Sequence, residues 1–259
     1  MGNLGGGYMC ACMGIPIGKF VAAVNVNDIT HRLIQTGAFH RAETMHKTLS
    51  EAISKLRLQL VVLRTTASLG LMLYSYSLVD IQVPYNAERL LYYLTGCKSD
   101  LIKKWYQQMD ATRKLDLPPE WLAKLQKRFT SARVTDEQMC ATLRRVYKTH
   151  AYLADPHTAV ALDAAQQLGY DVDRGPSAPP VAILSTASPC KFEEAVTVAV
   201  GSDAWQSYVA SNNFPASAKA VLAKREITPI RYQALETLED SQLAWERQAR
   251  EILAQLEKL

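Results

Sequence analysis

The first residues of the chain combine closely spaced glycines with an apolar segment, a pattern that could bind an anion. Glycines at positions 2, 5, 6 and 7 let the backbone adopt unusual conformations and approach a ligand closely. The apolar residues 8–13 and Gly14 predict a short helix that ends at a glycine. A glycine loop before such a helix directs backbone N–H groups and the positive end of the helix dipole at one point, which suits a phosphate. The alternative interpretation is an ordinary disordered chain end.

Two later stretches carry side chains that could also serve a site. Asp155 and Pro156 predict the start of a helix, with Asp155 as the N-cap, and they place His157 in its first turn. His157 could face a pocket or simply pack. The hydroxyl-rich residues 185–189 follow residues 181–184, which predict a buried strand, and ligands of α/β folds bind beyond the carboxyl ends of strands. An ordinary turn capped by Ser188 is the alternative.

Composition and charge argue against several classes of protein. The net charge of +4 is small, and no basic stripe with interleaved aromatic residues is present, so we expect no nucleic-acid partner. The five cysteines are scattered, and Cys10 and Cys12 lack the spacing and the second pair of a zinc site. Reduced thiols and the absence of a secretory pattern favour a cytoplasmic protein without a metal.

The elements that must position these residues follow an α/β order near the start of the chain. Residues 19–24 predict a strand, residues 25–28 a turn, and residues 29–36 a helix that ends at Gly37. The middle of the chain is helical by its apolar spacing. There, residues 118–129 predict one helix with Phe129 on its apolar face, and Thr135 begins a capping box.

Residues 54–79 differ from their surroundings. They carry three basic residues and no acidic one, and they show neither a helical nor an alternating period. A membrane span is disfavoured because Arg64, two threonines and Ser68 interrupt the apolar run. We therefore expect an insertion or a buried hairpin, and no membrane contact.

Three segments in this order resemble the C-terminal part of threonine synthases and threonine synthase-like proteins. They are residues 2–5 with residues 27–29, then residues 155–160, then residues 185–192. The resemblance implies the tryptophan-synthase-β-like fold of pyridoxal-phosphate enzymes, known as fold type II. It implies part of the large α/β domain with a helical subdomain, and an absent N-terminal half. The expected divisions are residues 1–53 with the phosphate loop, 54–79 as the insertion, 80–150 as the helical subdomain, and 151–259 with the cofactor-ring contact and a terminal helix.

The resemblance also implies a cofactor, a reaction and site residues. The family binds pyridoxal 5′-phosphate and converts O-phosphohomoserine and water to threonine and phosphate, so the implied partner is a small phosphorylated amino acid. The hydroxyl of Thr186 would contact the pyridine nitrogen of the cofactor, and Asp155 and His157 would shape the pocket. The cofactor phosphate would bind at five residues: Gly2, Asn3, Leu4, Gly5 and Gly6. The family usually has an acidic residue where Gly6 stands.

Two departures from the family affect the expected activity. The lysine that forms the Schiff base precedes the glycine loop in the family, so the resemblance places no catalytic residue in this chain. Lys191 follows the ring contact and does not replace it. Relatives also pass almost directly from the equivalent of Ile53 to that of Asp80, so residues 54–79 are expected to be a retained intron, a gene-model error or a lineage-specific insertion.

Two function classes follow. The first is part of a threonine-synthase-type lyase that is inactive alone, with phosphohomoserine or phosphothreonine as the substrate of the parent enzyme. The second is a non-catalytic binding or signalling protein built on the same scaffold. A lysine-containing N-terminal half encoded in frame upstream would favour the first.

Overall fold

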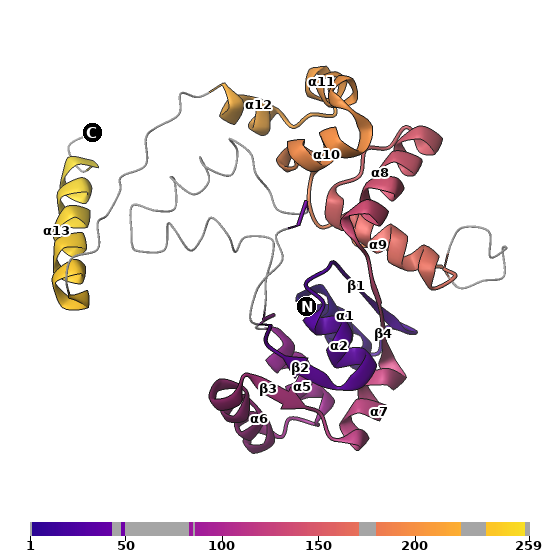
Figure 1. Ribbon diagram of the computed structural model, residues 1–259, viewed down its shortest axis with the longest axis vertical. Helices are drawn as coiled ribbons and strands as arrows, with labels where there is room; N and C mark the ends of the chain where they lie inside the picture. The colour runs from indigo at the N-terminus through magenta and orange to yellow at the C-terminus, as the bar shows by residue number, and fades with distance from the viewer. Residues whose placement is uncertain are drawn as a thin grey trace.

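The computed structural model describes residues 2–42, 48–49, 83–84, 86–170, 180–223 and 237–256. The expected insertion, residues 54–79, lies outside the described residues. Figure 1 shows the strands β1 and β4 between two groups of helices, with α5–α7 on one side and α8–α12 on the other. This arrangement is mixed α/β and rich in helices, as the sequence predicts.

The parallel pair of β1 (Phe20–Val24) and β4 (Phe129–Arg133) joins distant parts of the chain. Phe20 pairs with Phe129 and Val24 pairs with Arg133. The rings of Phe20 and Phe129 stack with centroids 5.1 Å apart. The prediction that Phe129 lies on a helix face is wrong, because α7 (Pro119–Arg128) ends one residue earlier. Pairing with β1 and ring stacking on Phe20 favour the extended conformation at this position.

The helix after β1 is confirmed, and it leads into a second pair of strands. α2 (Ile29–Thr36) ends at Gly37, whose φ of 82° is left-handed and whose N–H donates to the carbonyl of Leu33 over 3.0 Å. β2 (Ala38–His40) then pairs in antiparallel fashion with β3 (Lys114–Asp116). Phe39 and Leu115 face each other in this register, and both are buried.

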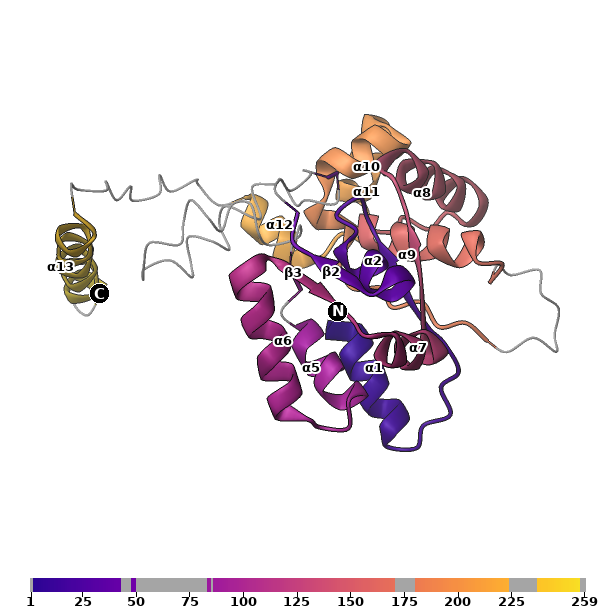
Figure 2. The same ribbon diagram turned by 60° about the horizontal axis from the view of Figure 1, so that its bottom comes forward.

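The first core cluster gathers apolar side chains of α2, β2 and β3 with those of three more helices. α5 (Asn86–Leu94), α6 (Ser99–Thr112) and α7 each contribute buried residues. α1 (Gly2–Cys12) packs against this cluster through Leu4 and Tyr8. Figure 2 shows α1, α5 and α6 gathered on one side of the molecule.

Two further clusters form the other group of helices. The second cluster contains buried residues of α8 (Asp136–His150), α9 (Pro156–Gln167) and α10 (Glu193–Val200). The capping box at Thr135 is confirmed. The Thr135 side chain accepts from the backbone N–H of Gln138, and the Gln138 side chain accepts from the backbone N–H of Thr135. The third cluster includes the short turn η2 (Pro189–Lys191), α11 (Ser202–Ala210) and α12 (Ala216–Leu222). The clusters of the described residues contain no residue of α13 (Leu238–Leu256).

The buried strand expected at residues 181–184 is not observed. Residues 181–184 form no strand, and Val181 and Leu184 are 42% and 59% exposed. A strand is stabilised by hydrogen bonds to a neighbour. No neighbour in the described part of the chain pairs with these residues, so their β-branched and apolar composition does not produce a strand here.

Gly37→Ala should destabilise the fold. An added Cβ would lie 3.4 Å from both the Cβ and the carbonyl oxygen of Leu117, and the left-handed conformation itself disfavours alanine. We expect a loss of about 1–2 kcal/mol in the free energy of unfolding, measured by urea denaturation. Gly18→Ala is the matched control, because its Cβ would meet nothing within 4 Å. Equal losses for the two variants would contradict this assignment.

Candidate functional site

Asp155 lies at the centre of a hydrogen-bond network at the start of α9. Its side chain is fully buried. The carboxylate oxygen Oδ1 accepts from the backbone N–H of His157 over 2.9 Å and from that of Thr158 over 3.3 Å. These bonds satisfy two backbone N–H groups that have no acceptor within the helix. The predicted N-cap at Asp155, with Pro156 in the first helical position, is therefore confirmed.

The same carboxylate also orients two side chains. Nδ1 of His157 lies 3.1 Å from Oδ1, and the hydroxyl of Thr158 donates to Oδ2. Burial raises the pKa of Asp155, but the hydrogen bonds from His157 and Thr158 outweigh burial and hold the pKa below its usual value. An ionised carboxylate only accepts, so Nδ1 of His157 must carry a proton. In neutral His157, Nε2 is then the acceptor nitrogen.

Both oriented side chains contact residues 185–192, which include the hydroxyl-rich segment predicted from the sequence. Oγ of Ser185 lies 3.2 Å from Oγ1 of Thr158. The ring of His157 meets the ring of Phe192 edge to face, with centroids 5.1 Å apart. His157 thus packs on a neighbour while its side chain remains 32% exposed. Thr186, which follows Ser185 directly, is exposed.

The glycine-rich start of the chain is helical, which differs from the predicted loop. The helix was expected to begin at residue 8, but α1 begins at Gly2 and includes all four glycines of residues 2–7. Leu4 and Tyr8 pack on the first core cluster, and a Cβ at Gly7 would lie only 2.8 Å from the ring of Phe20. This packing favours the helix despite a cost of about 1 kcal/mol for each interior glycine. The N–H groups available to an anion are therefore those of the first turn of α1.

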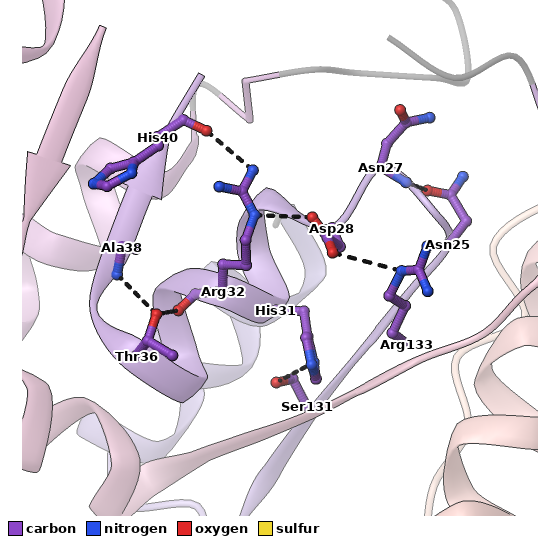
Figure 3. Close-up of polar contacts among 10 residues, drawn as sticks. All are labelled: Asn25, Asn27, Asp28, His31, Arg32, Thr36, Ala38, His40, Ser131 and Arg133. Atoms are coloured by element: carbon purple, nitrogen blue, oxygen red, sulfur yellow. Dashed lines mark hydrogen bonds and ion pairs between the residues drawn. The ribbon is translucent and has the colours of Figure 1, made fainter. Parts of the chain in front are cut away.

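A second polar network joins the carboxyl ends of β1 and β4 (Figure 3). Asp28 follows β1, and its oxygens lie 2.9 Å from Nε of Arg32 and 3.5 Å from Nε of Arg133. Arg32 also donates to the backbone carbonyl of His40 over 3.1 Å. Sequence analysis did not find this network, because it depends on the pairing of β1 with β4. One carboxylate therefore contacts two guanidinium groups at this edge.

The predicted site residues differ in the direct contacts that they make. Ser185 joins the Asp155 network, whereas no hydrogen bond within the described residues links Thr186 to residues 2–6. Neither a cluster of three metal-ligating side chains nor a helix with the length and apolar character to cross a bilayer occurs in the described segments. The lysines of these segments are all exposed, including Lys19 and Lys191.

Comparison with known proteins agrees with the resemblance read from the sequence. Residues 158–249 match the family model "Threonine synthase, C-terminal". The chain is 35% identical over 198 residues to threonine synthase-like 2 of Homo sapiens, an alignment that covers 76% of this chain and 35% of that protein. It is 31% identical over 195 residues to the threonine synthase of Pseudomonas aeruginosa, covering 75% of this chain and 35% of that protein. The chain is homologous to threonine synthases and threonine synthase-like proteins.

The solved structure of a pyridoxal-phosphate-bound threonine synthase from Brucella melitensis has the same fold. It superposes with a TM-score of 0.68 at 23% identity, over 94% of this chain and 42% of that one. The chain thus spans about a third of the length of the threonine synthases and threonine synthase-like proteins that it matches in sequence. Asp155 lies three residues before the segment matched by the family model, while Thr158, Ser185 and Thr186 lie within it.

Replacing Asp155 should destabilise the fold strongly. Asp155→Ala removes an N-cap and leaves the buried Thr158 hydroxyl without its acceptor, so we expect a loss of about 2–4 kcal/mol in the free energy of unfolding. The measurement is urea denaturation at pH 7. Asp163→Ala is the matched control, because Asp163 on the same helix accepts from Thr142 and Gln167 but is less buried. We expect it to lose about 1 kcal/mol. A loss for Asp155→Ala no larger than that of the control would contradict the assignment.

The stability contributed by Asp155 should depend on pH in a defined direction. Its folded-state pKa is depressed, so its contribution is complete above the unfolded value of about 3.9 and is lost as the pH falls through the folded value. The difference in unfolding free energy between the natural chain and Asp155→Ala should therefore be fully present at pH 5. It should shrink below pH 4. A difference that grows as the pH falls below 4 would contradict a depressed pKa of Asp155.

Proposed function

We propose that this chain forms part of a pyridoxal-phosphate-dependent lyase of the threonine synthase type, which converts O-phosphohomoserine and water to threonine and phosphate. The observation that supports this most directly is the similarity to threonine synthases over about three quarters of the chain. The match to the C-terminal family model includes Ser185 and Thr186. The fold of the described residues agrees with this class.

The start of α1 fits the phosphate of the cofactor. The first backbone N–H groups of a helix have no partner within the helix, and they lie at the positive end of its dipole. A Cβ at Gly5 or Gly6 would meet no atom within 4 Å, so the surface is open there. Asn3 is exposed and adds an amide side chain beside these N–H groups. We therefore assign the phosphate contacts to the first turn, Gly2, Asn3, Leu4 and Gly5, and not to Gly6, whose N–H has the Gly2 carbonyl as its partner within the helix.

Thr186 is suited to the other end of the cofactor. Its hydroxyl is exposed, and its neighbour Ser185 is fixed by Thr158. A neutral hydroxyl beside the pyridine nitrogen does not favour the protonated ring as a carboxylate would. Pyridoxal phosphate supplies an electron sink when it is bound. Thr186 orients the ring, and the α1 amides hold the phosphate in this proposal.

We propose further that this chain does not hold the cofactor covalently by itself. Lysines that bind carbonyl groups of cofactors are activated by desolvation or by a neighbouring charge. The described lysines are exposed instead. The same observation favours the second candidate function, a binding protein on the threonine synthase scaffold without catalysis.

The first test of this proposal is turnover. With added pyridoxal phosphate, the chain should release no phosphate from O-phosphohomoserine above the rate of a protein-free control. Borohydride reduction should leave no adduct at one specific lysine. The threonine synthase of Pseudomonas aeruginosa is the positive control. Turnover, or a single reduced lysine, would contradict the statement that this chain does not act alone.

The second test concerns cofactor binding in a completed assembly. The described residues form only two-stranded sheets, which are marginally stable, and parallel strands are normally covered on both faces. The part of the Pseudomonas aeruginosa enzyme that this chain does not match, supplied separately, should therefore tighten pyridoxal phosphate binding, measured by fluorescence titration. Thr186→Ala and Gly5→Asp should each weaken this binding about tenfold, the effect of one lost hydrogen bond or one repelled charge.

Matched controls identify the residues responsible. Gly18→Asp also adds a carboxylate at a glycine with open surroundings, and Thr112→Ala removes an exposed hydroxyl at the end of α6. Neither should change the cofactor affinity of the completed assembly. If Thr186→Ala and Gly5→Asp behave like these controls, the cofactor does not bind at α1 and Thr186.

A further inference from the structure

The segment of residues 185–192 is held at both ends by neighbouring side chains of α9. At one end, Oγ of Ser185 lies 3.2 Å from Oγ1 of Thr158. At the other end, the ring of Phe192 meets the ring of His157 at 5.1 Å. Thr186 lies between these two contacts in the sequence. Cys190, also between them, is buried in the third core cluster.

The hydrogen bonds in this network have only one consistent direction. The single hydroxyl proton of Thr158 is donated to Oδ2 of Asp155, which is acceptor-only when ionised. Oγ1 of Thr158 must therefore accept from Ser185, and the hydroxyl proton of Ser185 is fixed toward Thr158. The proton on Nδ1 of His157 is likewise directed at Asp155, which sets the plane of the ring that meets Phe192. One buried carboxylate thus determines the orientation of both side chains that contact the segment.

The backbone of the segment has little other support before η2. Residues 181–186 belong to no helix or strand, so no regular ladder of hydrogen bonds fixes their position. Ser188 interacts with the hydroxyl of Tyr208 on α11, and its carbonyl accepts from the N–H of Lys191 over 3.2 Å. These contacts lie after Thr186. Before Thr186, the hydrogen bond between Ser185 and Thr158 ties the described residues 180–185 to α9.

We propose that Asp155, acting through Thr158 and His157, is a positioning residue that sets the place of residues 185–192 and with it the place of the Thr186 hydroxyl. Asp155 contacts neither Thr186 nor any reacting group, so it acts only through its neighbours. The role of Thr186 as the ring contact rests on the proposed function. The positioning of the segment does not depend on it.

The test is amide hydrogen exchange of the full chain, followed by mass spectrometry of peptides that cover residues 184–192. Thr158→Val keeps the shape of the side chain but can neither donate to Asp155 nor accept from Ser185. Ser185→Ala removes the donor at an exposed position, so this variant should fold normally. Both variants should speed exchange of the amides of Lys191 and Phe192, which donate to the carbonyls of Ser188 and Pro189, about tenfold, the effect of one lost hydrogen bond. Thr158→Ser keeps the hydroxyl and should retain the exchange rate of the natural chain.

Thr142→Val is the matched control for a general loss of stability. Thr142 is buried on α8, and its hydroxyl donates to Oδ1 of Asp163 over 2.9 Å. Thr142→Val should leave exchange of the Lys191 and Phe192 amides unchanged relative to the rest of the chain. Unchanged exchange of these amides in both Thr158→Val and Ser185→Ala would overturn the proposal. So would an equal effect of Thr142→Val.

A second readout separates this proposal from the proposed function. In the completed assembly, Thr158→Val should weaken pyridoxal phosphate binding, and Thr158→Ser should restore it. If Thr158→Val speeds exchange but both Thr158→Val and Thr186→Ala leave the affinity unchanged, the positioning role stands and the assignment of Thr186 to the cofactor fails. If exchange is unchanged while Thr186→Ala still weakens binding, the positioning role fails and the cofactor site stands.

Discussion

The buried carboxylate of Asp155 is the constraint on which the start of α9 and its neighbouring segment depend. Removing a charge from water is costly, and the cost is offset here by two backbone N–H donors and two side-chain donors. The same four bonds cap the helix and fix His157 and Thr158. Helix geometry and the position of residues 185–192 are therefore coupled through one residue. A change that disturbs one should disturb the other.

The parallel pair of β1 and β4 is the second constraint, and it acts through a different charge. Asp28 lies beyond β1 and contacts Arg32 on α2 and Arg133 at the end of β4. This contact holds the carboxyl ends of both strands and the start of α2 together. Gln35 of α2 reinforces it by donating to the backbone carbonyl of Ser131 over 3.3 Å. Asp28 thus acts at the carboxyl ends of β1 and β4, and Asp155 acts at the start of α9.

Local signals in the sequence predict much of the fold, and non-local contacts account for the rest. Gly37, the capping box at Thr135 and the Asp155 N-cap act within a few residues, so the ends of α2 and the starts of α8 and α9 could be read directly. The conformations of Phe129 and residues 181–184 could not be predicted in this way, because they depend on whether a distant strand pairs with these residues. The hydrogen bond between Thr158 and Ser185 joins residues 27 positions apart, so the sequence did not predict it either. The helix over residues 2–7 depends on packing against Phe20, which glycine content does not reveal.

An ionised Asp155 fixes His157, and the tautomer of His157 tests this interaction most directly. Long-range ¹H–¹⁵N correlation spectra at pH 8 distinguish a protonated imidazole nitrogen from an unprotonated one. Our account predicts that Nδ1 of His157 carries the proton and that Nε2 is unprotonated, because Nδ1 lies 3.1 Å from an acceptor-only oxygen. Asp155→Ala should remove this preference. Protonation of His157 on Nε2 in the natural chain would contradict the account.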